Sequence, residues 1–117
     1  MKMPNSHNAV VDAEKITGYL LNPEHPDNGG KARFFLELGF SREGWPVLAA
    51  AFQKLAAAGS VVNNMETPHG GKYIVDGRIA SPSGKTPVVR TIWIVDRGVE
   101  SPRLVTARTR GKDETDD

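Results

Sequence analysis

The 117-residue chain contains no cysteine, and this absence excludes two kinds of stabilising site. Without thiols the chain can form neither a disulfide framework nor a cysteine-ligated zinc site. Three histidines remain as soft metal ligands, namely His7, His25 and His69. A chain of this length can bury one hydrophobic core without such staples. We therefore expect a single domain with no structural metal and no cofactor.

Long hydrophobic runs are missing as well. No stretch approaches the roughly 18 apolar residues that a membrane-spanning helix requires, and the N-terminal segment lacks the apolar run of a signal peptide. We therefore expect no membrane contact and a cytoplasmic location. A toxin domain trimmed from a larger exported protein would have the same composition.

An overall excess of one charge is absent, because 15 basic side chains face 14 acidic ones. The charges are nevertheless segregated along the chain. Residues 1–68 carry six bases and seven acids, residues 69–111 carry eight bases and three acids, and residues 112–117 carry one base and four acids. The basic segment is compatible with a phosphate-bearing partner, and the same charges also suit an ordinary solvated sheet face.

Apolar residues at three- and four-residue spacing predict two short helices before residue 40. Asp12 is placed to cap the first helix, which ends at Asn22-Pro23. The second helix spans residues 31–38 and ends at Gly39. The segment between the two helices is rich in proline, glycine and asparagine, which indicates a turn.

A third and longer helix is predicted between Ser41, a suitable N-terminal cap, and Gly59, whose expected left-handed conformation would end it. One side of this helix is continuously apolar, with Trp45, Leu48, Ala49, Phe52, Leu55 and Ala56. Its alanines keep the helix slim enough to pack closely on a sheet.

After Gly59 the pattern changes to strands. β-Branched and aromatic residues separated by turn sequences predict four strands, at residues 60–67, 72–79, 88–96 and 103–109. Three helical segments followed by four consecutive strands indicate an α+β fold, with the helices packed on one face of a four-stranded antiparallel meander sheet. We expect this domain to span residues 10–109, between a disordered N-terminus (1–9) and a disordered acidic tail (110–117).

Alternation along the strands places basic and hydroxyl side chains on the sheet face away from the helices. Lys72 points away from the core or lies at its rim, and Arg90 and Thr106 lie on the two strands that follow. Two cations and a hydroxyl group arranged in this way predict a site that stabilises a scissile phosphate. A polar outer sheet face without such a role would have the same sequence.

Two Gly-Gly-Lys tripeptides, ending in Lys31 and Lys72, do not fit the spacing of an ATP-binding P-loop, so ATPase activity is not supported. The first tripeptide opens a predicted helix. Free backbone N–H groups there, together with Lys31 and Arg33, predict a phosphate-binding site. Flexible turn glycines beside a surface lysine are the alternative interpretation.

Five further residues are candidates for cleaving or contacting RNA. His25 and His69 are the histidines inside the predicted domain, and histidine suits proton transfer near neutral pH. Each of them also fits a surface turn without a catalytic role. Arg78 and Arg108 are predicted to bind phosphate, and Trp93 either stacks on a base or lies in or near the core.

Several short motifs resemble an uncharacterised family of small bacterial domains, over residues 10–108. The motifs that carry the resemblance include Tyr19-Leu-Leu, Pro23-Glu-His25-Pro26, Lys31-Ala-Arg-Phe-Phe, Gly71-Lys72-Tyr73, Arg90-Thr-Ile-Trp93 and Pro102-Arg-Leu-Val-Thr106-Ala107. The family has no established activity, so the resemblance implies membership without implying a function.

The order of helices and strands is also similar, more distantly, to the barnase, EndoU, colicin and RelE-type ribonucleases of bacterial toxin systems. That likeness implies metal-independent cleavage of RNA. It further implies His25 or His69 as the proton donor or acceptor, Lys72 and Arg90 as phosphate binders, and Thr106 as a positioning group.

Two functional hypotheses follow. The first is a toxin-like domain that binds and cleaves RNA and is held in check by an immunity or antitoxin protein. The second is a non-enzymatic interaction protein, such as a phage or mobile-element inhibitor that binds a larger protein target through one sheet face or edge. A toxin should harm cells that express it, whereas an inhibitor should be tolerated. The sequence predicts no oligomeric state.

Overall fold

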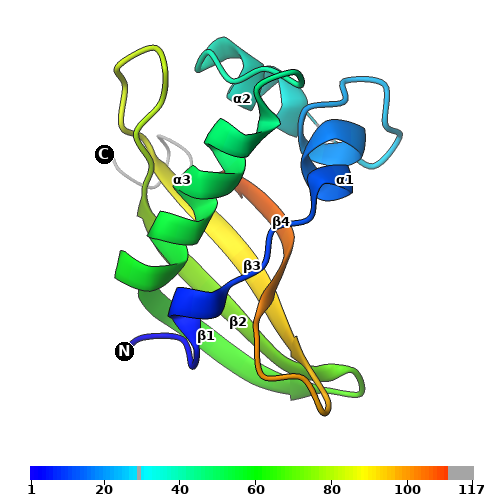
Figure 1. The fold of residues 1–117 in the computed structure, drawn as a ribbon, viewed down its shortest axis with the longest axis vertical. Coiled ribbons are helices and arrows are strands. Elements are labelled where there is room, and N and C mark those ends of the chain that lie inside the picture. The colour runs from blue at the N-terminus through cyan, green and yellow to red at the C-terminus, as the bar shows by residue number, and fades with distance from the viewer. Residues whose placement is uncertain (29, 111–117) are drawn as a thin grey trace.

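The computed structural model describes residues 1–28 and 30–110, and Figure 1 shows their fold. The helical elements are η1 (Ser6–Asn8), α1 (Ala13–Lys15), η2 (Ile16–Leu20), α2 (Lys31–Glu37) and α3 (Trp45–Ala58). The strands are β1 (Ser60–Thr67), β2 (Gly70–Arg78), β3 (Val88–Asp96) and β4 (Arg103–Thr109). The predicted α+β arrangement, with helices first and strands second, is confirmed.

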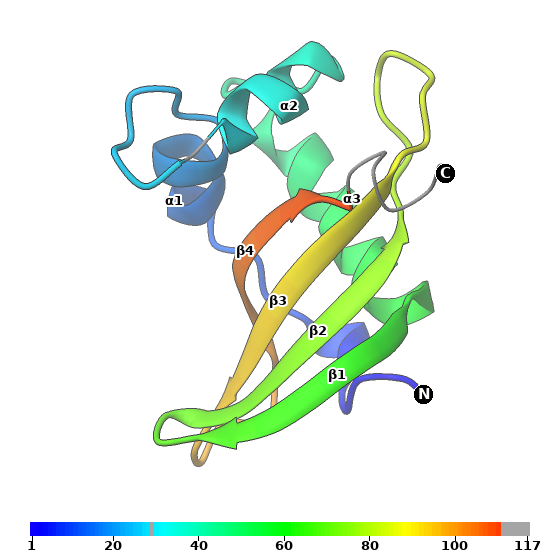
Figure 2. The same cartoon turned by 180° about the vertical axis from the view of Figure 1, so that it is seen from behind.

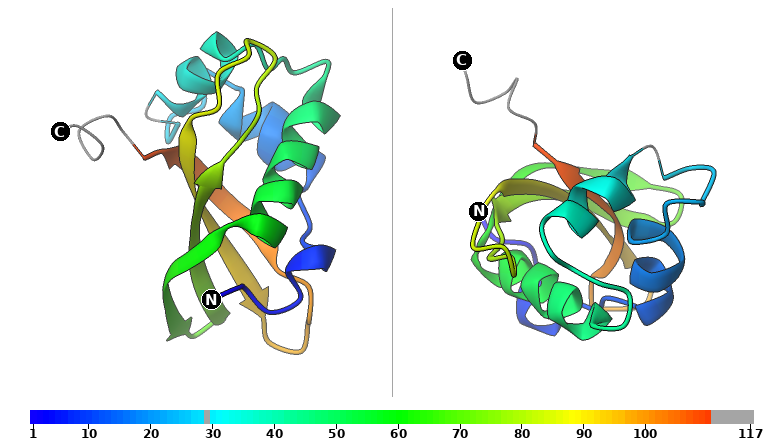
Figure 3. Two further views of the ribbon diagram at one scale, coloured as in Figure 1. Left: turned by 90° about the vertical axis from the view of Figure 1, so that its left-hand side faces the viewer. Right: turned by 90° about the horizontal axis from the view of Figure 1, so that it is seen from above.

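The four strands form one antiparallel sheet in the order β1-β2-β3-β4, so each strand pairs with its neighbour in the sequence. Figure 3 shows the helices as a layer on one side of this sheet, and α3 lies across the strands in Figure 1. The opposite face of β1, β2 and β3 is covered by no helix of the described residues (Figure 2). We call this the outer face.

The core lies between α3 and the inner face of the sheet. From α3 it receives Leu48, Phe52 and Leu55, and from the strands Val75, Val89 and Trp93, none of which is more than 2 % exposed. Complete burial of an aliphatic side chain of this size stabilises a fold by about 1.5–3 kcal/mol. The apolar periodicity that predicted α3 is therefore the pattern that forms the core.

The two ends of α3 differ from the prediction. Its first residue is Trp45, and the hydroxyl of Ser41 instead accepts the N–H of Gly44 in the preceding turn, at 3.0 Å. Gly59 has φ −76°, which is not a left-handed conformation. A Cβ atom on Gly59 would lie 2.7 Å from the carbonyl oxygen of Asp76, so glycine is required by the close approach of α3 to β2.

The alternation predicted for β4 is interrupted by a bulge. Ile92 pairs with Thr106, but the next residue of β3, Trp93, pairs with Leu104, so Val105 is an extra residue in β4. Leu104 consequently faces the core, where it is 3 % exposed, whereas Thr106 remains on the outer face. Strict alternation would have placed Leu104 and Thr106 on the same face.

The N-terminal segment 1–9, expected to be disordered, packs against the domain. Met3 is 2 % exposed and belongs to the core. The ammonium group of Lys2 donates a hydrogen bond to the carbonyl of Ala58 at 2.8 Å, and Val10 forms a parallel bridge with β4. The polar composition of the segment gave no sign of this packing.

Residues 111–117, which make up most of the predicted acidic tail, lie outside the described part of the chain. Among the described residues, no helix combines the length and apolar character needed to cross a bilayer.

Candidate functional site

The outer face of the sheet carries a hollow next to the turn between β1 and β2. Its volume is about 480 Å³, which lies within the range of ligand-binding pockets. The residues lining it come from all four strands and the turn, and are Thr67, His69, Lys72, Ile92, Ile94, Arg103, Val105 and Thr106. Three residues predicted to be catalytic, His69, Lys72 and Thr106, therefore line one hollow.

A second hollow adjoins the first and is lined by α1, η2 and the start of β4. Its residues are Asp12, Glu14, Lys15, Gly18, Tyr19, His25, Arg103 and Leu104. Arg103 lines both hollows, and the phenol oxygen of Tyr19 lies 3.1 Å from Oγ1 of Thr106. We call the two hollows together the outer groove.

Tyr19 lies where the two hollows meet, and it was not among the predicted site residues. Its phenol oxygen accepts a hydrogen bond from Nζ of Lys31 at 2.7 Å. Nζ of Lys31 and Nζ of Lys15 lie 5.3 and 5.4 Å from the centroid of its ring. Burial raises the pKa of the phenol, but the hydrogen bonds with Lys31 and Thr106 and the two ammonium charges outweigh burial and lower the pKa below its ordinary value. The four-residue spacing of Lys15 and Tyr19 was the one available sequence signal.

Local structure explains how Lys31 reaches Tyr19. Residues 16–20 form a π-helical turn, a conformation that occurs frequently at functional sites. The side chain of Asn28, 3 % exposed, joins this turn to α2, because Nδ2 donates to the carbonyl of Tyr19 at 2.6 Å and Oδ1 accepts the N–H of Ala32 at 2.8 Å. Lys31 and the N–H of Ala32 are thus engaged in hydrogen bonds within the protein. The phosphate site predicted at the start of this helix required both groups to face an anion.

His25 lies at one end of the outer groove, with its ring edge-on to Tyr19 at a centroid distance of 5.0 Å. Its Nδ1 accepts a hydrogen bond from the backbone N–H of Asp27 at 3.0 Å. Nδ1 therefore carries no proton, and the neutral ring has its hydrogen on Nε2. In this arrangement Nε2 is the nitrogen of His25 that can donate a hydrogen bond to a ligand in the groove.

His69 lies at the other end of the groove, in the exposed turn before β2. The residue after it, Gly70, pairs with Asp96, which is four residues along β3 from Ile92, the partner of Thr106. Four residues of a strand span about 13 Å. The backbone of the turn that carries His69 therefore lies about this far along the sheet from Thr106, while the His69 side chain lines the same hollow.

In the first hollow, Lys72 is a cation that is open to a ligand. Within the described residues its ammonium group has neither a hydrogen-bond partner nor an ion pair. Arg103, by contrast, donates from Nε and Nη2 to the carboxylate of Asp96 at 2.7 and 3.2 Å. This hydrogen bonding lowers the pKa of Asp96 and raises that of Arg103. An anion in the first hollow would therefore find its main counter-charge at Lys72.

Arg90 lies on the outer face but does not line the groove. Its Nε and Nη2 donate to the carboxylate of Asp76 at 2.8 and 2.9 Å, and Nη1 of Arg110 donates to the same carboxylate at 2.7 Å. Burial raises the pKa of Asp76, but the hydrogen bonds and charges of the two arginines outweigh burial, so the pKa lies below its ordinary value. The sequence had suggested that Arg90 is grouped with Lys72 and Thr106. In the structure Arg90 is instead bound in an ion-pair cluster with Asp76.

The other predicted phosphate contacts are dispersed over the surface. Arg33 is exposed and pairs with Glu37 on its own helix at 3.2 Å. Arg78 donates from Nη1 to the carbonyl of Thr86 at 2.7 Å. Arg108 is exposed on β4, and none of these three arginines lines the outer groove.

Trp93 is a core residue, so its ring does not reach a base at the surface. It is 0 % exposed, and its Nε1 donates to the hydroxyl of Thr91 at 2.7 Å. That hydroxyl donates in turn to the carbonyl of Val75 at 2.8 Å. The chain of hydrogen bonds satisfies the buried indole within the protein.

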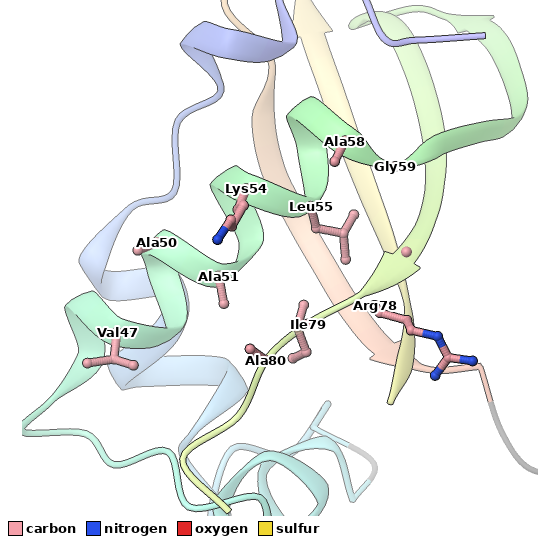
Figure 4. Close-up of a pocket in the computed structure, with 11 residues that line it drawn as sticks. Val47, Ala50, Ala51, Lys54, Leu55, Ala58, Gly59, Arg78, Ile79 and Ala80 are labelled. Atoms are coloured by element: carbon pink, nitrogen blue, oxygen red, sulfur yellow. The ribbon is translucent and has the colours of Figure 1, made fainter. Parts of the chain in front are cut away.

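A third hollow lies between α3 and the end of β2 (Figure 4). Its walls are mainly alanine and aliphatic side chains, among them Ala51, Leu55 and Ile79. Lys54 and Arg78 are the charged residues in its described lining, and the guanidinium group of Arg78 points away from α3. With no acid, histidine or hydroxyl in its described wall, this hollow offers no group for proton transfer.

The described residues also bring no three histidine, aspartate or glutamate side chains together around a possible metal ion.

No match was found among curated proteins. Among solved structures, a chain of the "Contact-dependent growth inhibition toxin - immunity protein complex from Klebsiella pneumoniae 342" is similar, with a TM-score of 0.72 and 24% sequence identity. The alignment covers 92% of this chain and 97% of that chain, and it shows a shared fold. The predicted resemblance to an uncharacterised family is confirmed by a family match over residues 2–111. The chain belongs to the family described as "Domain of unknown function (DUF6883)".

Proposed function

We propose that this chain is a toxin-like domain that binds RNA in the outer groove and cleaves it without a metal ion. Cleavage of RNA by its own 2′ hydroxyl requires a proton-transfer group and a cation that stabilises charge on the phosphate. The observation that carries the proposal is the placement of Tyr19, Thr106 and Lys72 along the outer groove, with Thr106 and Lys72 on the strands and Tyr19 on η2 beside them. An RNA target places this activity in the cytoplasm.

The structural neighbour supports the same proposal, because it is a chain of a complex between a toxin and its immunity protein. A domain that cleaves RNA would harm the cell that makes it. We therefore propose that the natural partner of this chain is an immunity or antitoxin protein that blocks the outer groove.

The same neighbour also supports a second candidate function. A complex of a toxin with an immunity protein has an inhibitory member, and a small inhibitor would bind a larger protein without any catalysis. In that case the outer groove would be a protein-binding surface, and RNA would be neither bound nor cleaved.

The test is incubation of the purified protein with total RNA in the presence of a chelator, followed by gel analysis. The informative variant is Lys72→Ala, because loss of one phosphate contact should weaken RNA binding and reduce the salt slope of binding by about one. The matched control is Lys54→Ala, which removes a lysine from α3 in the helix layer. We expect cleavage by the wild type and by Lys54→Ala, and weaker binding and cleavage by Lys72→Ala. Absence of cleavage by folded wild-type protein, together with normal growth of cells that express it, would favour the inhibitor.

A further inference from the structure

Within the outer groove, the geometry points to Tyr19 as the catalytic acid that protonates the departing 5′ oxygen of RNA, an assignment that rests on the proposed cleavage function. The tyrosine is the central member of its cluster. Its phenol oxygen contacts both Lys31 and Thr106, which come from α2 and β4, at 2.7 and 3.1 Å.

The hydrogen bonds define where the phenol proton can go. An ammonium group has no lone pair, so Lys31 donates its hydrogen bond and the phenol oxygen accepts it. The phenol hydrogen is then left to point at Oγ1 of Thr106 or at a ligand beside it. Thr106 lines the hollow that also holds Lys72, so a phosphate bound at Lys72 would share that hollow with the hydroxyl that the phenol of Tyr19 contacts.

The charges around the ring favour release of that proton. The ammonium nitrogens of Lys15 and Lys31 lie 5.4 and 5.3 Å from the ring centroid, and both stabilise the negative charge of a phenolate. The lowered pKa of Tyr19 has the same cause. The phenolate formed by transfer of the proton is stabilised by the same two ammonium groups and by the hydrogen bond from Lys31.

The histidines are less suited to this step. His25 uses its Nδ1 to accept the N–H of Asp27, so this nitrogen carries no proton that it could give to the leaving oxygen. His69 lines the hollow too, but it lies in the turn before Gly70, whose backbone is about 13 Å along the sheet from Thr106, the residue that Tyr19 contacts. Thr106 has an alcohol of high pKa, which makes it a positioning residue for Tyr19 rather than an acid.

The reaction balances as follows. The 2′ hydroxyl loses its proton to a water molecule, and the 2′ oxygen attacks phosphorus. The bond between phosphorus and the 5′ oxygen breaks, and the 5′ oxygen takes the proton of Tyr19. The products are a 2′,3′-cyclic phosphate and a free 5′ hydroxyl, and the hydronium ion formed in the first transfer returns a proton to the phenolate. No group is oxidised or reduced.

The experiment compares two synthetic RNA substrates of one sequence, one with the natural 5′ oxygen at the cleavage site and one with a bridging 5′ sulfur. A thiolate leaves without protonation, so its departure needs no acid. We expect Tyr19→Phe to slow cleavage of the oxygen substrate by about 100-fold or more, and to leave cleavage of the sulfur substrate nearly unchanged. Tyr73→Phe, which removes the other phenol of the chain, should cleave both substrates like the wild type.

Equal losses on both substrates would show a structural role for Tyr19 and overturn the assignment, and so would full activity of Tyr19→Phe on the oxygen substrate. In both cases the proposed RNA cleavage would stand. Failure of the wild type to cleave either substrate would instead remove the proposed function, and the assignment with it. If Tyr19→Phe does not fold, the wild-type pH profile decides, because an acidic role requires the cleavage rate to fall as pH rises through the pKa of Tyr19.

Discussion

Nζ of Lys31 lies 2.7 Å from the phenol oxygen of Tyr19, although twelve residues separate the two in the sequence. The contact exists because the buried Asn28 bonds both to the carbonyl of Tyr19 and to the first turn of α2. The contact brings the positive charge of Lys31 to the phenol of Tyr19 at the surface of the outer groove. We make three predictions, on this contact, on the ion-pair cluster around Asp76 and on the burial of Met3.

The first prediction concerns the effect of Lys31 on the ionisation of Tyr19. Lys31→Met keeps most of the side-chain length and removes both the hydrogen-bond donor and the charge. The pKa of Tyr19 should rise as a result, because the phenolate loses its nearest stabilising group. Absorbance of tyrosinate against pH measures this pKa directly in a Tyr73→Phe background, where Tyr19 is the remaining tyrosine.

The matched control for that titration is Arg33→Met. It removes a charge of the same sign from the same helix, but the side chain of Arg33 is exposed and pairs with Glu37. The pKa of Tyr19 should stay the same in this variant. A pKa that does not rise in Lys31→Met, or that rises equally in both variants, would contradict the contact.

The second prediction concerns the ion-pair cluster around Asp76, whose side chain is 11% exposed. Asp76→Asn keeps the shape of the side chain but removes the charge that Arg90 and Arg110 bind, and we expect a loss of about 2 kcal/mol in the free energy of unfolding at pH 7. Because the pKa of Asp76 is lowered in the fold, its contribution is present above the unfolded pKa of about 3.9 and is lost as pH falls through the folded pKa.

Urea unfolding of the two proteins at a series of pH values measures this effect. The stability difference should be largest near neutral pH and should shrink below about pH 3.9. Asp96→Asn is the control, because its carboxylate pairs with Arg103 at a more exposed site. A variant Asp76→Asn as stable as the wild type at pH 7 would show that the cluster adds nothing to the fold.

The third prediction concerns the N-terminal segment. Met3 is 2 % exposed, so Met3→Ala should leave a cavity and lower the free energy of unfolding by about 2 kcal/mol or more. Met65→Ala truncates a methionine that is 44 % exposed on β1, and its effect should be much smaller. Thermal unfolding of both variants measures the difference. Equal stability of the two would mean that residues 1–9 are as loosely held as their composition suggested.

Much of the fold could be predicted from local pattern. The apolar stripe of α3 and the alternation of Val89, Thr91 and Trp93 in β3 each follow the period of their own element, and each set of side chains is buried. Turn residues mark the ends of the strands, so three of the four strands have the predicted bounds. Local spacing also placed Lys72 on the outer face, where the structure has it.

The candidate site could be predicted only in part. His69, Lys72 and Thr106 line the outer groove as a group, but Arg90 is bound to Asp76, and Trp93 is buried. No local pattern shows which carboxylate an arginine will find across a sheet. The bulge at Val105 is also invisible to a two-residue period, and it decides that Leu104 and Thr106 lie on different faces.

The sequence by itself determined the α+β class, the order of the elements, the basic second half and the family, because each depends on residue types and on spacing within a short stretch. Only the tertiary structure decided that Tyr19 meets Lys31 and Thr106, since these residues belong to three separate elements. Their contact depends on how a π-helical turn, a short helix and a bulged strand pack together. The lowered pKa of Tyr19 arises from these distances, which no single segment of the chain encodes.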